Sequence, residues 1–133
     1  LDPIVELKEM EYLNLKSNPV SIESLGKVIN NLPKLTTLDL SNTGIMNFPE
    51  IQINSAIQYF YLSGNQIQDI SFLNSFPNLI YVDLSNNPIS KLLPLERCTF
   101  LKELDLKYTN LSESEIIAAK SGYMGLKALD IKK

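Results

Sequence analysis

The sequence lacks several residue types on which catalytic sites depend. It has no histidine, so the usual proton shuttle and commonest metal ligand is absent. Its single cysteine, Cys98, excludes an internal disulfide framework. The net charge is −3 and the lysines are scattered, so no basic field attracts nucleic acid or anionic lipid. We therefore expect no enzyme, no metal site and no nucleic-acid partner.

Long apolar runs and glycine-rich loops are also missing. No apolar stretch is long enough to cross a bilayer, so we expect no membrane insertion. Gly122 and Gly125 are too few for a phosphate-binding loop, and we expect neither a cofactor nor a small-molecule substrate. Apolar residues make up 44% of the 133 residues, which suffices for one folded domain with a core.

One pattern recurs along the chain. The copies begin at residues 10, 35, 57, 79, 101 and 126, and read MEYLNLKSNPV, LTTLDLSNTGI, IQYFYLSGNQI, LIYVDLSNNPI, LKELDLKYTNL and a truncated LKALDIKK. The intervals between these starts are 25, 22, 22, 22 and 25 residues. Self-similarity at such a period predicts a solenoid whose neighbouring repeats bury a shared core.

This pattern, L-x-x-L-x-L-x-x-N-x-L, resembles the leucine-rich repeat family over essentially the whole chain. The resemblance implies an α/β solenoid. It would be a right-handed arc with a concave parallel sheet of about six strands and short convex 3₁₀ or helical segments. The 22-residue interval is similar to the short repeats of bacterial internalins and of a regulatory subunit of protein phosphatase one. The two 25-residue repeats depart from that class.

The spacing within each repeat predicts a strand followed by a corner. Leucines that alternate along the strand point inward, which predicts one continuous core containing Leu38, Leu40, Leu62, Leu84, Leu104 and Leu106. At the corner, a polar side chain can satisfy backbone groups that stacked turns would leave unpaired. The residues predicted to form this internal ladder are Asn18, Thr43, Asn65, Asn87 and Thr109.

Between the strands the apolar spacing becomes three, which suits short 3₁₀ turns. The two series are Ile67, Ile70, Leu73, Phe76, Leu79 and Ile89, Leu92, Leu95, Cys98, Leu101. Cys98 is thereby predicted to be a buried apolar residue rather than a reactive thiol.

The two longer repeats predict helices instead of 3₁₀ turns. Ser21 is a plausible N-cap for the first helix, whose buried face would contain Ile22, Leu25, Val28, Ile29 and Leu32. For the second helix, Ser112 and Glu115 stand at capping-box spacing, and Gly122 is a plausible stop.

We interpret residues 1–133 as a single leucine-rich repeat domain, with residues 1–9 as the tail of an earlier repeat. Two interpretations stay open: a fragment of a longer array, or a small domain whose edges the termini cover. No signal-peptide pattern opens the sequence. The compartment is left undetermined between the cytoplasm and the surface or secreted proteins of bacteria.

The residues between the inward leucines would line the concave face, which is the usual binding surface of the family. Tyrosine suits protein interfaces because it offers a large area, a polar tip and little entropy to lose. The predicted partner-binding residues are Tyr12, Asn14, Thr37, Asp39, Tyr59, Tyr61, Tyr81, Asp83, Glu103, Asp105 and Tyr108. By the same alignment, Asp130 takes the place of Asp105 in the sixth strand, and Ala128 that of Glu103.

Two functional hypotheses follow. In the first, the domain is a protein–protein interaction module that binds another protein on this Tyr/Asp-lined face. In the second, it is a structural spacer or scaffold within a larger bacterial surface or effector protein, and flanking regions bind the partner.

Overall fold

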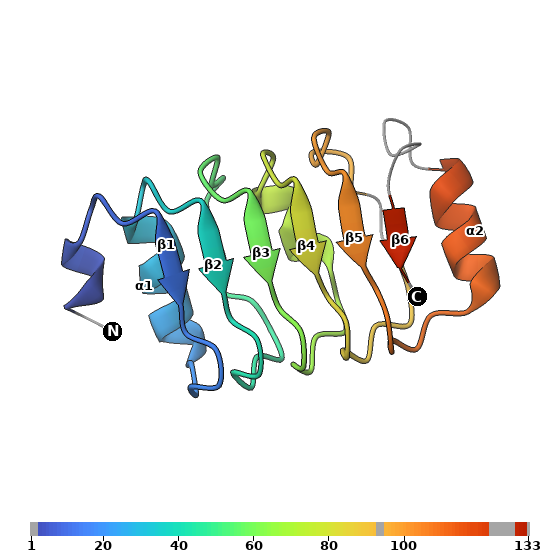
Figure 1. The fold of residues 1–133 in the computed structure, drawn as a ribbon, viewed down its shortest axis with the longest axis horizontal. Helices are drawn as coiled ribbons and strands as arrows, with labels where there is room; N and C mark the ends of the chain where they lie inside the picture. Colours follow the sequence, from blue (N-terminus) through green and yellow to red (C-terminus); the bar gives the residue numbers. More distant parts are fainter. Residues whose placement is uncertain (1–2, 93–94, 123–129, 133) are drawn as a thin grey trace.

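The computed structural model describes residues 3–92, 95–122 and 130–132. Six parallel strands form one sheet in chain order (Figure 1). Leu13, Leu38, Phe60, Val82 and Leu104 lie opposite one another in the first five. Each repeat therefore contributes one strand. The strands are β1 (Tyr12–Asn14), β2 (Thr37–Asp39), β3 (Tyr59–Tyr61), β4 (Tyr81–Asp83), β5 (Glu103–Asp105) and β6 (Asp130–Lys132).

Helical segments precede β1 and lie between β1 and β2, between β3 and β4, and between β5 and β6. They are the 3₁₀ helices η1 (Ile4–Glu6) and η2 (Ser71–Ser75) and the α-helices α1 (Ile22–Asn31) and α2 (Glu113–Gly122). In Figure 1, α1 lies behind the first strands and α2 lies beyond β6 at the far end of the sheet. The two helices occupy the two 25-residue repeats, as predicted. The fold is thus a leucine-rich repeat arc with a parallel sheet and short helical segments.

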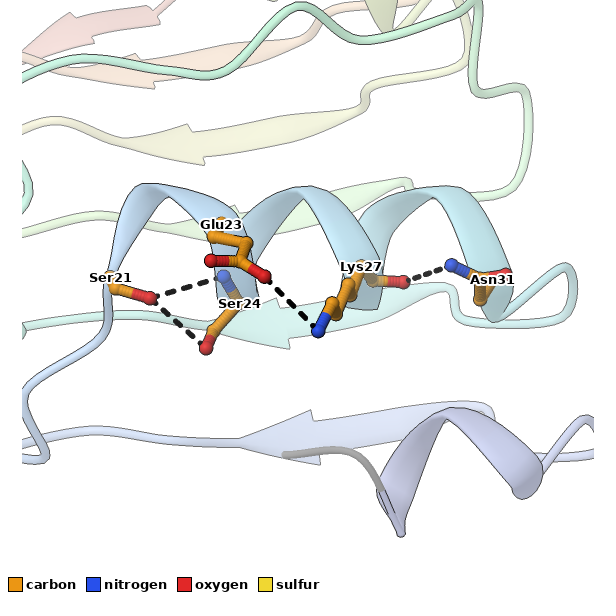
Figure 2. Close-up of polar contacts among 5 residues, drawn as sticks. All are labelled: Ser21, Glu23, Ser24, Lys27 and Asn31. Atoms are coloured by element: carbon orange, nitrogen blue, oxygen red, sulfur yellow. Dashed lines mark hydrogen bonds and ion pairs between the residues drawn. The ribbon is translucent and has the colours of Figure 1, made fainter.

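The sequence signals for the helix starts are confirmed. Ser21 Oγ accepts a hydrogen bond from the backbone N–H of Ser24 at 3.1 Å, and the Glu23 carboxylate lies 3.3 Å from Lys27 Nζ (Figure 2). Ser112 Oγ accepts in the same way from the N–H of Glu115 at 3.2 Å. Each hydroxyl satisfies a backbone donor that has no partner within the helix.

One residue of α1 was assigned to the wrong face. Leu25, Val28 and Ile29 are buried, but Ile22 is half exposed. It lines a shallow surface groove beside Gly44 and Met46 instead of entering the core. The helical period alone did not distinguish this first helical residue from the buried residues of the same face.

The core is continuous along the array, as the alternation predicts. All six leucines named above are buried in one cluster, together with both series of residues spaced by three. In the third repeat Phe60 replaces the second motif leucine. Its ring makes edge contacts with the rings of Phe48, Phe72 and Phe76, at centroid distances of 6.0, 6.4 and 5.3 Å.

Asn65 and Asn87 form the predicted internal ladder. The Nδ2 group of Asn87 donates to the carbonyls of Leu84 and of Leu62 in the preceding repeat, and its Oδ1 accepts from the N–H of Ile67. Asn65 repeats the arrangement one turn earlier and also accepts from Thr43, which is buried. The side chains therefore tie successive turns together through their backbone groups.

The ends of the ladder differ from the prediction. Asn18 is exposed, and among the residues that the structure describes its side chain donates only to the carbonyls of Leu15 and Lys16 in its own turn. Thr109 is half-buried and donates to the carbonyl of Leu106. Burial of the ladder side chain depends on the repeats packed around it, which the motif letters do not encode.

The sixth strand is paired two residues away from the motif alignment. Asp130 lies opposite Glu103 rather than Asp105, and Ile131 lies opposite Leu104. Side chains alternate between the two faces with a period of two, so a shift of two residues leaves each side chain on the same face of the sheet. Only the position of β6 along β5 differs from the prediction. The predicted repeat start at Leu126 and the position of Ala128 lie outside the described residues. In the described part of the chain, none of the helices has the length and apolar character needed to traverse a bilayer.

Candidate functional site

The outward-facing residues of β1–β5 form two parallel rows, which we call the sheet face. Strand pairing places Tyr12, Thr37, Tyr59, Tyr81 and Glu103 side by side in the first row. The second row, one alternation further along each strand, consists of Asn14, Asp39, Tyr61, Asp83 and Asp105. The structure thus brings ten of the eleven predicted partner-binding residues together on one face of the sheet.

Tyrosines occupy the centre of the sheet face. The rings of Tyr61 and Tyr81, on adjacent strands, lie with centroids 5.4 Å apart and planes tilted by 44°. Tyr59 is 37% exposed and Tyr12, nearer the end of the array, is 60% exposed. Among the tyrosine hydroxyls of the described residues, only that of Tyr12 has a hydrogen bond, which it accepts from Asn14 Nδ2 at 3.5 Å. The central phenol groups can therefore contact a partner without first breaking an internal bond.

The carboxylates give this face a negative electrostatic potential. The pKa of Tyr81 is raised to about 12, first by burial and then, in decreasing order, by the charges of Asp83, Asp105, Glu103 and Tyr61. The pKa of Tyr61 is also raised, first by burial and then, in decreasing order, by electrostatic interaction with Asp39, Tyr12, Asp83 and Tyr59. A phenolate in this position would be disfavoured by its neighbours, so both tyrosines stay neutral hydrogen-bond donors at neutral pH.

The aspartates have a structural role that the sequence analysis missed. Oδ1 of Asp39, Asp83 and Asp105 accepts the backbone N–H two residues later, at 2.9, 3.0 and 3.1 Å. Asn14 makes the same contact at 2.9 Å. This is the side-chain turn that Asp and Asn favour, and it closes each strand. The recurring D-L-S and D-L-K letters carried the signal.

Tyr108, the eleventh predicted residue, lies just beyond the end of β5 in an unusual backbone conformation. Its φ is 58°, in the left-handed region, and its side chain is 78% exposed. The same position in other repeats also has positive φ and is occupied by Ser17, Asn42, Gly64 and Asn86. The corner thus requires a left-handed residue, and a bulky aromatic is the most costly of those present.

Replacing Tyr108 by asparagine should therefore stabilise the domain. Asparagine tolerates the left-handed region, and Asn86 stands at this position one repeat earlier. We expect the free energy of unfolding to rise by about 0.5–1 kcal/mol, part of the left-handed penalty. Chemical denaturation of the variant measures this change. A loss of stability would mean that the Tyr108 ring makes contacts worth more than its backbone strain.

A second surface feature was not predicted from the sequence. Phe100 is 62% exposed and lines a shallow groove with Ile80, Leu101 and Lys102, beside the amino ends of β4 and β5. The signal was Phe100 itself, a large apolar residue that falls outside the three-residue spacing. Its lining includes Gln58, Ile80 and Lys102, which directly precede the first-row residues Tyr59, Tyr81 and Glu103.

The fold and its open sheet define a repeat solenoid of a type that is typically non-catalytic. A sequence profile described as "Leucine Rich repeats (2 copies)" matches residues 55–97. The chain belongs to the leucine-rich repeat family. It is 32% identical over 119 residues to the Mus musculus tubulin-specific chaperone E, an alignment that includes 81% of this chain and 23% of that protein. It is 31% identical over 96 residues to Toll-like receptor 4 of Sus scrofa, with 70% and 11% covered.

Solved structures show the same fold. An internalin from Listeria monocytogenes superposes with a TM-score of 0.78 at 21% identity, covering all of this chain and 37% of the internalin. A chain of the Drosophila melanogaster SNF/U2A' complex gives a TM-score of 0.67 at 19% identity, covering 100% of this chain and 84% of that one. The chain spans 23% and 11% of the two sequence relatives named above, so their whole-protein activities are not carried over to it.

Proposed function

We propose that this domain binds another protein on its sheet face. Leucine-rich repeat domains are generally protein-interaction modules. The observation that carries the proposal is the cluster of Tyr59, Tyr61 and Tyr81 on adjacent strands, facing outward from a sheet whose core is closed beneath them. Tyrosine anchors contribute large contact area at low entropic cost.

The strands hold these side chains in a fixed arrangement. β3 and β4 are paired on both edges, and buried residues alternate with the tyrosines along each strand. A partner would therefore meet an ordered surface and would not have to pay for ordering the backbone on binding. A spacer has no use for outward tyrosines of this kind, and no feature of the described residues favours that alternative.

The relatives support a protein as the partner. One is named as a chaperone specific for tubulin, another as a receptor, and one solved relative is a chain of the SNF/U2A' complex. By analogy, the partner of this domain would be a protein whose identity this chain does not specify.

The test is a double substitution in the middle of the sheet face. Tyr59→Thr with Tyr81→Thr removes two rings but keeps a strand-forming residue, and Thr37 occupies the same row in the intact protein. With the natural partner, recovered by quantitative affinity capture, each lost anchor should weaken binding by about 2 kcal/mol or more, as at other hot spots. Isothermal titration with that partner measures the loss.

A matched control lies across the core. Ile22→Ser removes an exposed apolar side chain from α1, the helix that lies behind the first strands (Figure 1), and should leave affinity unchanged. If the control abolishes binding while the double substitution has no effect, the contact surface lies on the helical side and the proposal is wrong.

A further inference from the structure

The formal charge of the sheet face is more negative than that of the whole chain. Its ten positions contain four carboxylates, those of Asp39, Asp83, Glu103 and Asp105, and no basic residue. Their formal charge is −4 against −3 for the whole chain, so the remaining residues sum to +1. Lys16 and Lys107 follow β1 and β5 outside the two rows. Within β1–β5 the negative charge is therefore concentrated in the two rows where the tyrosines lie, while in β6 Lys132 pairs with Asp105.

The two central tyrosines, Tyr61 and Tyr81, each have a carboxylate beside them in the same row. Tyr61 lies between Asp39 and Asp83 in one row, and Tyr81 lies between Tyr59 and Glu103 in the other. Neighbouring strands are about 4.8 Å apart, so every ring of the central pair has a carboxylate one strand away. A cation beside the Tyr61–Tyr81 pair would be close to two aromatic rings and to the carboxylates on the neighbouring strands.

The aspartates keep an oxygen for such a ligand. Asp39 and Asp83 use Oδ1 for the turn that closes the strand, and within the described residues no hydrogen bond involves their Oδ2. Structural use of one oxygen fixes the orientation of the carboxylate and does not consume its charge. An acceptor held in place in this way is suited to a directional donor.

We infer that the sheet face recognises a basic segment of a protein partner, with an arginine side chain placed over the Tyr61–Tyr81 pair and hydrogen-bonded to Asp83. This rests on the proposed function and specifies the chemistry of the partner. Arginine fits better than lysine because its planar guanidinium stacks on an aromatic ring and presents several donors at once. The raised pKa of Tyr61 and Tyr81, caused first by burial and then by these carboxylates, agrees with a field that attracts cations.

The test measures binding of a short acetylated and amidated peptide of alternating arginine and serine at low ionic strength. Binding is detected by changes in the amide chemical shifts of the domain. The matched peptide has citrulline at each arginine, which keeps the shape and removes the charge. We expect the arginine peptide to shift resonances of Tyr61, Tyr81 and Asp83, and to bind about tenfold more tightly than the citrulline peptide, the factor that corresponds to about 1.4 kcal/mol. Added salt should weaken only the arginine peptide.

The decisive variant is the triple substitution Asp39→Asn, Asp83→Asn, Asp105→Asn. Asparagine keeps the Oδ1 acceptor, as Asn14 does in the same row, so the strand ends stay closed while three charges are removed. This variant should lose the arginine-dependent tightening. Asp69→Asn is the control: Asp69 makes the same turn, with Ser71 at 2.8 Å, but lines a groove with Phe48 and Phe72 away from the two rows.

The outcomes separate the two proposals. Equal binding of both peptides on the sheet face would overturn the arginine inference and leave the proposed function standing. Shifts confined to other surfaces, or an equal loss in the Asp69→Asn control, would also overturn the inference. Failure of the proposed function would appear instead in the substitutions of Tyr59 and Tyr81 with the natural partner.

Discussion

Replacing Leu84 with alanine should lower the free energy of unfolding by about 2–5 kcal/mol, the range for a truncated core leucine. Leu84 is fully buried in the fourth repeat, between the buried Leu62 and Leu106 of its neighbours. Repeats on both sides hold the surrounding side chains in place, so the cavity cannot collapse fully. Denaturation monitored by circular dichroism measures the loss.

A leucine outside the core provides the control for this substitution. Leu7 is one of the apolar residues spaced by three at the start of the chain, between Ile4 and Met10. Its side chain is nevertheless 53% exposed. Leu7→Ala should change stability by less than about 0.5 kcal/mol, as surface substitutions usually do. Similar losses from both variants would contradict the assignment of inward and outward positions.

The second large effect is expected at the ladder. Asn87→Ala should destabilise the domain by about 1–3 kcal/mol, because the carbonyls of Leu62 and Leu84 and the N–H of Ile67 lose buried partners. The comparison is Asn18→Ala, where the side chain is exposed and its carbonyl partners can turn to water. We expect the cost at Asn18 to be clearly smaller. Equal costs would mean that Asn87 acts through the local turn and not by linking repeats.

The strands, the core and the central ladder could be predicted because each depends on local spacing. Alternation of two places Leu104 and Leu106 inward, spacing of three places Phe76 and Cys98 in the core, and a serine before an apolar helical period predicts the cap at Ser21. These signals repeat, and repetition makes each one easier to recognise. All of them are present in the structure as expected.

Other features depend on contacts between repeats, which a one-dimensional pattern does not contain. The same motif letter gives a buried Asn87 and an exposed Asn18, because only Asn87 has a repeat packed on each side. β6 pairs with β5 two residues away from the motif alignment, and the motif letters alone do not fix the register between two strands.

The sheet face was partly predictable. Strand periodicity gave the residues that share the face, and pairing in the structure places ten of them in two rows. The turn-closing role of Asp83 and the left-handed conformation of Tyr108 required coordinates, because both depend on backbone geometry at the strand ends.

Site-specific photo-crosslinking in the natural host tests most directly whether a protein partner occupies the sheet face. A benzophenone amino acid placed at Tyr59, in the centre of the face, is compared with the same amino acid at Ile22 on α1. Our account predicts a covalent adduct with one partner protein from Tyr59, and that this adduct disappears when Tyr81 is also changed to threonine. An adduct with that partner from Ile22 and none from Tyr59 would contradict it.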